Sequence, residues 1–111
     1  MLRRTTLALC LALAPACTVQ PNREDWPEQF SDAFCDWERR CMASSYFDNW
    51  DDHESCLDET SDDVDDILDA LPGCDFDERR AEDCLNRLND NCRESGDLQE
   101  IASICLDVLD C

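Results

Sequence analysis

Apolar residues recur from residue 26 onward at intervals of three and four, the spacing that puts side chains on one face of a helix. The first such stripe consists of Trp26, Phe30, Phe34, Trp37 and Cys41. Pro27 suits the first helical turn, because the N–H that proline lacks has no partner there. The stripe predicts a helix from about Pro27 to Ala43.

Two helices are predicted in the middle of the chain. The first is shorter, is capped at residues 48–49 and ends near Thr60. Its apolar positions are Trp50, Cys56 and Leu57. Ser61 is the predicted N-cap of the second, because two aspartates then occupy the first turn, where the helix dipole favours negative charge. The apolar stripe of this second helix is Val64, Ile67, Leu68 and Leu71, and residues 72–73 (Pro-Gly) end it.

A further helix is predicted from Asp77, its N-cap, to about Arg93, before Gly96 breaks the chain. Phe76 and Ala81 are placed to form a small hydrophobic staple across its first turn. Its apolar side carries Cys84, Leu85, Leu88 and Cys92.

The last helix is predicted to begin at Asp97, since Glu100 three residues later completes a capping-box pattern. Its stripe consists of Leu98, Ile101, Cys105 and Val108. The chain contains two glycines and no alternating β-branched run, so no strand is predicted. The fold class expected is all-α, a small disulfide-stapled helical bundle of about four helices.

The first seventeen residues read as a bacterial secretory leader. Arg3 and Arg4 precede an apolar stretch over residues 5–14, which is too short to span a membrane. Residues 14–16 (Ala-Pro-Ala) before Cys17 satisfy the small-x-small rule of signal peptidase and resemble a lipobox. We therefore expect a lipoprotein signal peptide over residues 1–16, a lipidated Cys17 with a tether over residues 17–24, and a disulfide-rich helical domain over residues 25–111.

Cysteine parity supports lipidation at Cys17. The chain has ten cysteines, and Cys10 leaves with the leader, so nine remain. An odd number in an exported protein leaves one thiol unpaired. With Cys17 acylated, eight remain for four disulfides: Cys35, Cys41, Cys56, Cys74, Cys84, Cys92, Cys105 and Cys111. The alternative is a soluble periplasmic or secreted protein with a free Cys17.

Helix geometry limits the pairing of these cysteines. Cys35 and Cys41, like Cys105 and Cys111, are six residues apart, and Cys84 and Cys92 are eight apart. Along a helix axis these separations are about 9 to 12 Å, whereas a disulfide needs Cα atoms within about 7 Å. Each cysteine should therefore pair with another element. The preferred pairs are those across short turns, Cys41 with Cys56 and Cys92 with Cys105.

The charge balance is strongly acidic. The chain has 28 acidic residues and nine basic ones, all arginine. After loss of the leader with its two arginines, 28 acids face seven arginines, a net charge of −21. Such a surface repels phosphate backbones and anionic headgroups, which excludes nucleic-acid binding and electrostatic membrane binding. The expected membrane contact is the N-terminal lipid.

The sequence contains no clear pattern of catalytic residues. No two cysteines are closer than six positions, so a C-x-x-C redox site is not expected. The single histidine, in residues 53–56 (His-Glu-Ser-Cys), resembles the H-D-x-C segment of small secreted phospholipases A2. The cysteine pair and glycine-rich calcium loop of those enzymes are missing here. We expect His53 to be exposed on an acidic surface, the protein not to be an enzyme and no cofactor to be needed, with a small secreted hydrolase as the remote alternative.

A dense carboxylate run raises the alternative of calcium binding, because calcium prefers several carboxylate oxygens. The run consists of Asp58, Asp62, Asp63, Asp65, Asp66 and Asp69. It lacks the glycine and the glutamate of an EF-hand loop, and a helix would spread the side chains around its axis. No specific metal site is therefore predicted.

A separate aromatic group follows the first predicted helix. Tyr46, Phe47 and Trp50 fall in the loop expected there and are candidates for an exposed partner-binding patch. The other aromatics, at helical spacing, are expected in the core.

The chain as a whole resembles small, acidic, cysteine-rich helical lipoproteins of unassigned function from high-GC bacteria such as myxobacteria. The resemblance is carried by residues 34–41 (FCDWERRC), 83–88 (DCLNRL) with Cys92, and 104–109 (ICLDVL). It implies envelope anchoring and a disulfide bundle, and assigns no catalytic residue. Thr18 after the anchor, in place of Asp, is similar to the outer-membrane default of lipoprotein sorting. The expected function is a lipid-anchored structural or protein-interaction module, periplasmic or surface-exposed, with an envelope protein as partner.

Overall fold

A computed structural model of the chain describes residues 20–111. The elements in chain order are α2 (Trp26–Cys41), α3 (Ala43–Asn49), α4 (His53–Ala70), β1 (Asp75–Phe76), α5 (Glu78–Asn89), α6 (Cys92–Ser95), α7 (Leu98–Leu106) and β2 (Leu109–Asp110). The predicted all-α, disulfide-rich fold is confirmed, with four longer helices and two short ones in the described part of the chain. The predicted leader and Cys17 lie outside the described residues.

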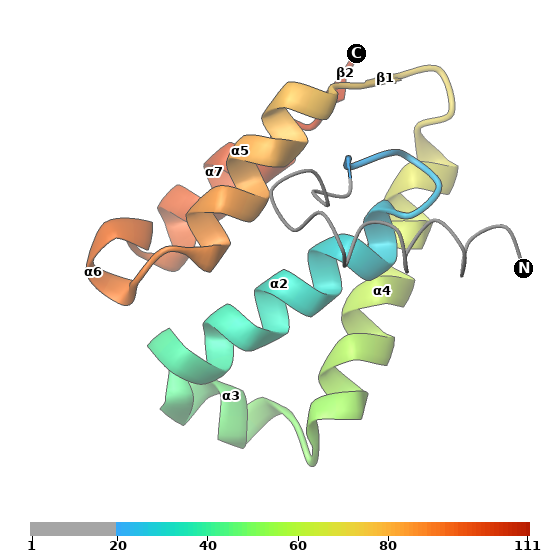
Figure 1. Ribbon diagram of the computed structural model, residues 1–111. Coiled ribbons are helices and arrows are strands. Elements are labelled where there is room, and N and C mark those ends of the chain that lie inside the picture. Colours follow the sequence, from blue (N-terminus) through green and yellow to red (C-terminus); the bar gives the residue numbers. More distant parts are fainter. Residues whose placement is uncertain (1–19) are drawn as a thin grey trace, which may run out of the picture.

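Helix α2 runs through the middle of the molecule. It packs against α4 on one side and α5 on the other, and α7 lies behind α5 (Figure 1). The short helices α3 and α6 follow α2 and α5 at the end of the molecule opposite the β1–β2 pair (Figure 1). Two layers are thus formed, α2–α3–α4 and α5–α6–α7, with α2 in contact with both.

The aromatic stripe of α2 forms much of the core between these layers. Trp26 and Trp37 are buried, and the rings of Phe30 and Phe34 stack with centroids 5.4 Å apart. The Trp37 indole N–H donates to Ser95 Oγ at 2.9 Å, which fixes α6 against α2. The predicted stripe is therefore the face of α2 that packs into the core, with Phe30, Phe34 and Cys41 partly buried against it.

The helix that follows α2 corrects two expectations. Helix α2 ends at Cys41 rather than Ala43, because Met42 leaves helical geometry with a φ of −135°. The segment after it is not a loop: residues 43–49 form α3, and Trp50 caps that helix in an extended conformation.

Helix α4 replaces the two helices predicted on either side of Thr60. It is continuous from His53 to Ala70, and Asp52 is its N-cap in place of residues 48–49. Ser61, the predicted N-cap, lies inside the helix. Both predicted segments share one stripe at four-residue spacing, Cys56, Thr60, Val64 and Leu68, which packs toward α2. A buried threonine in this stripe was misread as a break.

The second layer follows the predicted caps. Asp77 accepts a hydrogen bond from the N–H of Arg80 at 3.0 Å, and Asp97 accepts one from Glu100 at 2.9 Å, so both predicted N-caps are confirmed. Helix α5 ends at Asn89, not near Arg93, because Asn91 caps the separate helix α6. Cys92 therefore lies on α6 and not on the α5 stripe. Gly96, with a φ of 82°, ends α6.

A two-residue antiparallel strand pair was not predicted. It joins Asp75 to Asp110 and Phe76 to Leu109, beside the Cys74–Cys111 disulfide. The segments are too short for any alternation to show in the sequence. The pair fixes the C-terminal end of the chain next to the α4–α5 connection.

Four disulfides join the elements: Cys35–Cys56, Cys41–Cys92, Cys74–Cys111 and Cys84–Cys105. The preferred pairs Cys41–Cys56 and Cys92–Cys105 are wrong. Cys35, in the middle of α2, faces α4, whereas Cys41, at the end of α2, reaches α6. The predicted partner of Cys56 was correctly placed on α2. The partner is Cys35 in the middle of that helix, however, and not Cys41 at its end.

Arginines complete the fold by capping helix ends across the structure. Arg23 donates to the carbonyls of Leu68, Leu71 and Cys74 at 2.8, 3.0 and 2.9 Å. Arg40 donates to the carbonyls of Leu88 and Asp90 at the end of α5. These guanidinium groups supply donors to carbonyls at and just beyond the C-terminal ends of α4 and α5, where carbonyls have few or no partners within the helix. The predicted tether is therefore docked on the domain from Pro21, which is fully buried, onward.

Two disulfides allow a matched test of stabilisation. Cys35–Cys56 and Cys84–Cys105 both span 21 residues, so loop-closure entropy gives each about 3 kcal/mol. Cys35 and Cys56 are fully buried, whereas Cys105 is half-buried. Replacing Cys35 and Cys56 by Ala should lower the free energy of unfolding by more than the same change at Cys84 and Cys105, because it leaves a larger cavity. Guanidinium denaturation of the two double variants measures the difference, and equal losses would contradict it.

The N-cap of α4 gives a prediction for acid pH. Hydrogen bonds from the N–H and hydroxyl of Ser55 hold the pKa of Asp52 below its ordinary value of 3.8. The stability contributed by the ionised cap is therefore present above that value and is lost as the pH falls through the lowered folded-state pKa. Asp52→Ala should reduce Tm at neutral pH, and its deficit should shrink in strong acid. Asp52→Asn keeps a capping oxygen that does not titrate. A deficit of Asp52→Ala that stays constant with pH would contradict the assignment.

Candidate functional site

An apolar groove with a volume of about 220 Å³ lies between three helices. Its lining comes from α2 (Trp26, Phe30, Phe34), α4 (Val64, Ile67, Leu68), α7 (Leu98, Ile101, Ala102, Cys105, Leu106) and the C-terminal segment (Val108, Leu109). No charged side chain is among these lining residues. We refer to it below as the α4–α7 groove.

The groove has a buried base and an exposed rim. At the base, Trp26, Ile101 and Val108 are almost inaccessible to solvent. On the rim, Ile67 is 43% exposed, Leu98 43% and Leu106 68%. Large apolar side chains with this exposure lose water when something covers them, so the rim favours binding of an apolar surface.

The α2 wall of the groove is held rigid by aromatic contacts. The Trp26 ring meets Phe30 at 5.7 Å and Phe76 of β1 at 5.6 Å, the second in an edge-to-face arrangement. Phe76 is fixed in turn by its register opposite Leu109. The strand pair and the α2 stripe thus form one preorganised aromatic wall.

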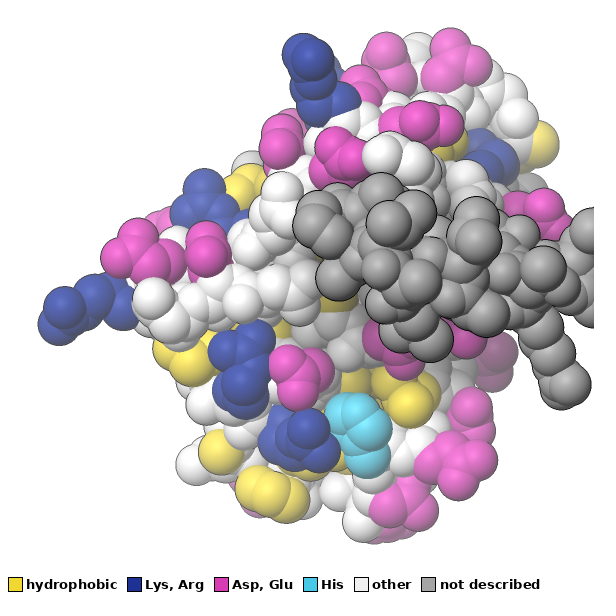
Figure 2. Space-filling view, in the orientation of Figure 1, with side chains coloured by type: hydrophobic (Ala, Val, Ile, Leu, Met, Phe, Trp, Pro, Cys, Tyr) yellow, Lys and Arg dark blue, Asp and Glu magenta, His cyan; other side chains and the backbone are white. Residues whose placement is uncertain are grey.

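The surroundings of the groove are acidic. Helix α4 contains eight acidic residues and neither lysine nor arginine. Helix α7 also lacks lysine and arginine, and the aspartates that flank it, Asp97 and Asp107, are exposed. Asp63, one turn before Ile67, is exposed as well. Figure 2 shows acidic side chains gathered over α4 on the face it presents.

The predicted aromatic patch is wrong for two of its three residues. Tyr46 is 3% exposed, and its hydroxyl forms a 2.7 Å hydrogen bond with His53 Nδ1. Trp50 is half-buried, and its indole N–H donates to Glu38 Oε1 at 2.6 Å. Phe47 is exposed, at 69%. Because residues 46 and 47 are neighbours on α3, the helix turns one inward and the other outward.

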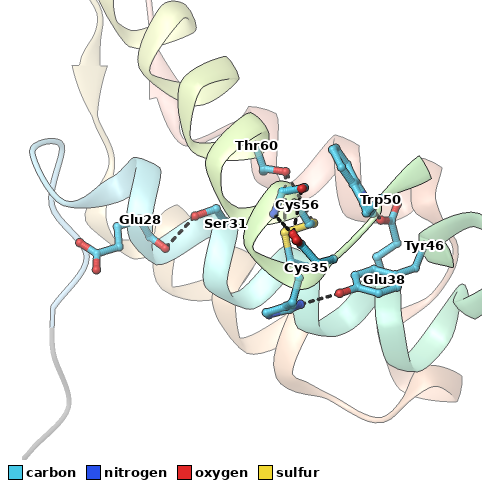
Figure 3. The surroundings of a disulfide bond; sticks show 11 residues. Glu28, Ser31, Cys35, Glu38, Tyr46, Trp50, Cys56 and Thr60 are labelled. Carbon is cyan, nitrogen blue, oxygen red and sulfur yellow. Dashed lines mark hydrogen bonds between the residues drawn. A yellow bond between two sulfur atoms is a disulfide. The ribbon is translucent and has the colours of Figure 1, made fainter. Parts of the chain in front are cut away.

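The same cluster surrounds the buried Cys35–Cys56 disulfide. Figure 3 shows Thr60 beside the bridge, with Tyr46, Glu38 and Trp50 nearby. The Thr60 hydroxyl lies 3.7 Å from the Cys35 sulfur and 3.9 Å from that of Cys56. This contact gives a buried hydroxyl a partner, which explains how Thr60 is tolerated inside α4.

His53 was predicted to be exposed on an acidic surface. It is instead half-buried at the start of α4. Its ring nitrogen is engaged by Tyr46, and the two rings lie 5.9 Å apart. The geometry assigns this histidine a role in joining α3 to α4.

The carboxylate run of α4 is spread over the solvent side of the helix. Each of its six aspartates is exposed. Within residues 20–111, no three His, Cys, Asp or Glu side chains are grouped so that they could hold a metal ion. None of the helices in that range is both long and apolar enough to cross a bilayer.

Comparison of the chain with protein-family models, with curated proteins and with solved structures gave no match. The candidate site therefore rests on geometry and chemistry alone. Sequence reasoning did not identify the groove, although it assigned most of its residues to helical stripes. A signal was available in the width of the apolar face of α7, because Ala102 and Leu106 lie beside the predicted stripe and make that face wider than one contact with α5 needs.

The Tyr46 hydroxyl provides a test of the corrected aromatic cluster. Tyr46→Phe should lower the free energy of unfolding by about 1 kcal/mol, because His53 loses its partner. Phe47→Ala, at the exposed neighbour, should change stability by less than about 0.5 kcal/mol. Denaturant titration of both variants measures the two effects. If Phe47→Ala were the more costly change, the orientation of α3 would be wrong.

Proposed function

We propose that this protein is a lipid-anchored protein of the bacterial cell envelope that acts as a protein-interaction module through its α4–α7 groove. The N-terminal leader pattern and Cys17 support the anchor. The open apolar groove on an acidic domain is the observation that carries the interaction role.

The four disulfides support an oxidising compartment. Disulfides persist in the periplasm and outside the cell, and thiols stay reduced in the cytosol. The bridges take in all eight cysteines of residues 20–111. Export would therefore leave Cys17 as the one thiol available for acylation after leader cleavage.

The groove supports recognition of another protein. Its rim exposes three large aliphatic side chains on a surface otherwise dominated by carboxylates. Contiguous apolar surface rimmed by polar residues is typical of protein–protein interaction sites. The rigid aromatic wall reduces the ordering cost of binding there.

Acylation is tested by intact mass of the protein recovered from bacterial membranes. The wild-type chain should begin at Cys17, carry an acyl adduct and show no titratable thiol without reductant. Cys17→Ala should lose the adduct and the membrane attachment while keeping four disulfides. Cys10→Ala, in the leader, is the matched control and should be acylated normally. A wild-type protein without an adduct and with one free thiol would contradict the proposal.

The interaction role is tested in the same cells with a photo-cross-linking residue at Leu106 or at Phe47. The two positions are equally exposed, at 68% and 69%, and only Leu106 lines the groove. Discrete adducts with an envelope protein are expected at Leu106 only. Adducts that are equal at both positions, or missing at both, would contradict a role of the groove.

A further inference from the structure

We infer that the occupant of the α4–α7 groove is a cationic amphipathic helix of a partner protein, a conclusion that rests on the proposed interaction role. Such a helix would set its apolar face on the groove and place Lys or Arg side chains over the acidic walls. The inference follows from the length of the groove, its lining and the charge around it.

The length of the groove suits about two helical turns. Along α2 its lining extends from Trp26 to Phe34, and along α7 from Leu98 to Leu106. Eight residues of helix correspond to about 12 Å at 1.5 Å per residue. A bound helix of that length presents anchors at i, i+3 or i+4, and i+7, the pattern by which grooves hold amphipathic helices.

The lining determines the character of those anchors. The groove offers aromatic and aliphatic carbon and no charged side chain, so apolar anchors bind there and buried polar ones would lose their water without compensation. Anchors that cover Ile67, Leu98 and Leu106 would remove from water the exposed large apolar side chains of the groove.

Charge selects the polar face of the occupant. Helix α4 has eight acidic residues, of which Asp63 lies one turn before Ile67, and α7 has Glu100; neither helix has a lysine or an arginine. Lys and Arg beside the apolar anchors would meet these carboxylates, which raises the association rate and favours the cationic ligand over an anionic one.

The same charge disfavours the other occupants. A second copy of this chain would bring another domain of strong negative charge against the same acidic walls. A fatty acid or an anionic headgroup would bring its own negative charge beside Asp63 and Asp107, both exposed. Neither repulsion applies to a cationic helix.

The experiment measures binding of two synthetic peptides to the disulfide-bonded protein purified from membranes. One peptide of about 14 residues carries leucines at i, i+4 and i+7 with lysines elsewhere, and its partner has glutamate for every lysine. The lysine peptide should bind at least about ten-fold more tightly. Its affinity should fall as salt is raised from about 50 to 500 mM, because added ions screen the charge contacts.

Matched variants locate the binding. Leu106→Asp should weaken the lysine peptide at least about ten-fold, because it puts a charge on the apolar rim. Phe47→Asp, at an equally exposed position outside the groove, should leave the affinity unchanged. Both positions are on the surface, and circular dichroism with a thiol count verifies that each variant has the native fold.

The inference is overturned if the two peptides bind equally, or if Leu106→Asp and Phe47→Asp weaken binding to the same extent. It is also overturned if the lysine peptide does not bind and the groove instead binds palmitate, anionic vesicles or a second copy of the chain, the last detected by sedimentation. A protein that is acylated and cross-links through Leu106 but does not prefer the lysine peptide would refute the inference alone. Missing acylation with selective peptide binding would refute the anchor alone.

Discussion

The covalent attachment of α2 to both layers is the constraint on which the rest of the structure depends. Cys35 joins α2 to α4, and Cys41 joins it to α6. With 28 acidic residues against seven arginines in residues 17–111, the domain repels itself electrostatically and has few apolar side chains to oppose this. Disulfides restrict the unfolded chain and are insensitive to charge, so they stabilise a domain of this composition where a small core alone would not.

The arginines have a consistent role in this acidic background. Arg23, Arg40, Arg80 and Arg87 each donate to a backbone carbonyl of another segment. Ion pairs with exposed carboxylates contribute little in water, whereas a helix end needs donors for its last carbonyls. The contacts of Arg23 and Arg80 fix the ends of α4 and α7, two of the three helices that line the groove. The arginine contacts therefore connect the stability of the fold with the geometry of the groove.

Sequence reasoning predicted much of the fold and little of the site. The stripe of α2, most of the stripes of α5 and α7, and the caps Asp77 and Asp97 were correct, because local spacing and capping chemistry decide them. Cys92 and Val108 were assigned to the last two stripes but lie beyond the ends of α5 and α7. It placed a break at Thr60, since a polar residue in an apolar stripe gives no sign that a disulfide sulfur will be its partner. It expected Tyr46 and Trp50 on the surface for the same reason: their partners, His53 and Glu38, are brought to them only by folding.

The sequence by itself determined most of the longer helices, the acidity and the leader pattern, since each depends on neighbouring residues or on composition. Only the tertiary structure decided which cysteines pair, because pairing depends on which turn of α2 faces α4 and which reaches α6. It also decided that the apolar faces of α2, α4 and α7 leave a groove partly open instead of closing into one core. Hydrophobic spacing indicates which face of a helix is apolar. The arrangement of the helices determines whether that face is covered by the same chain or left open to a partner.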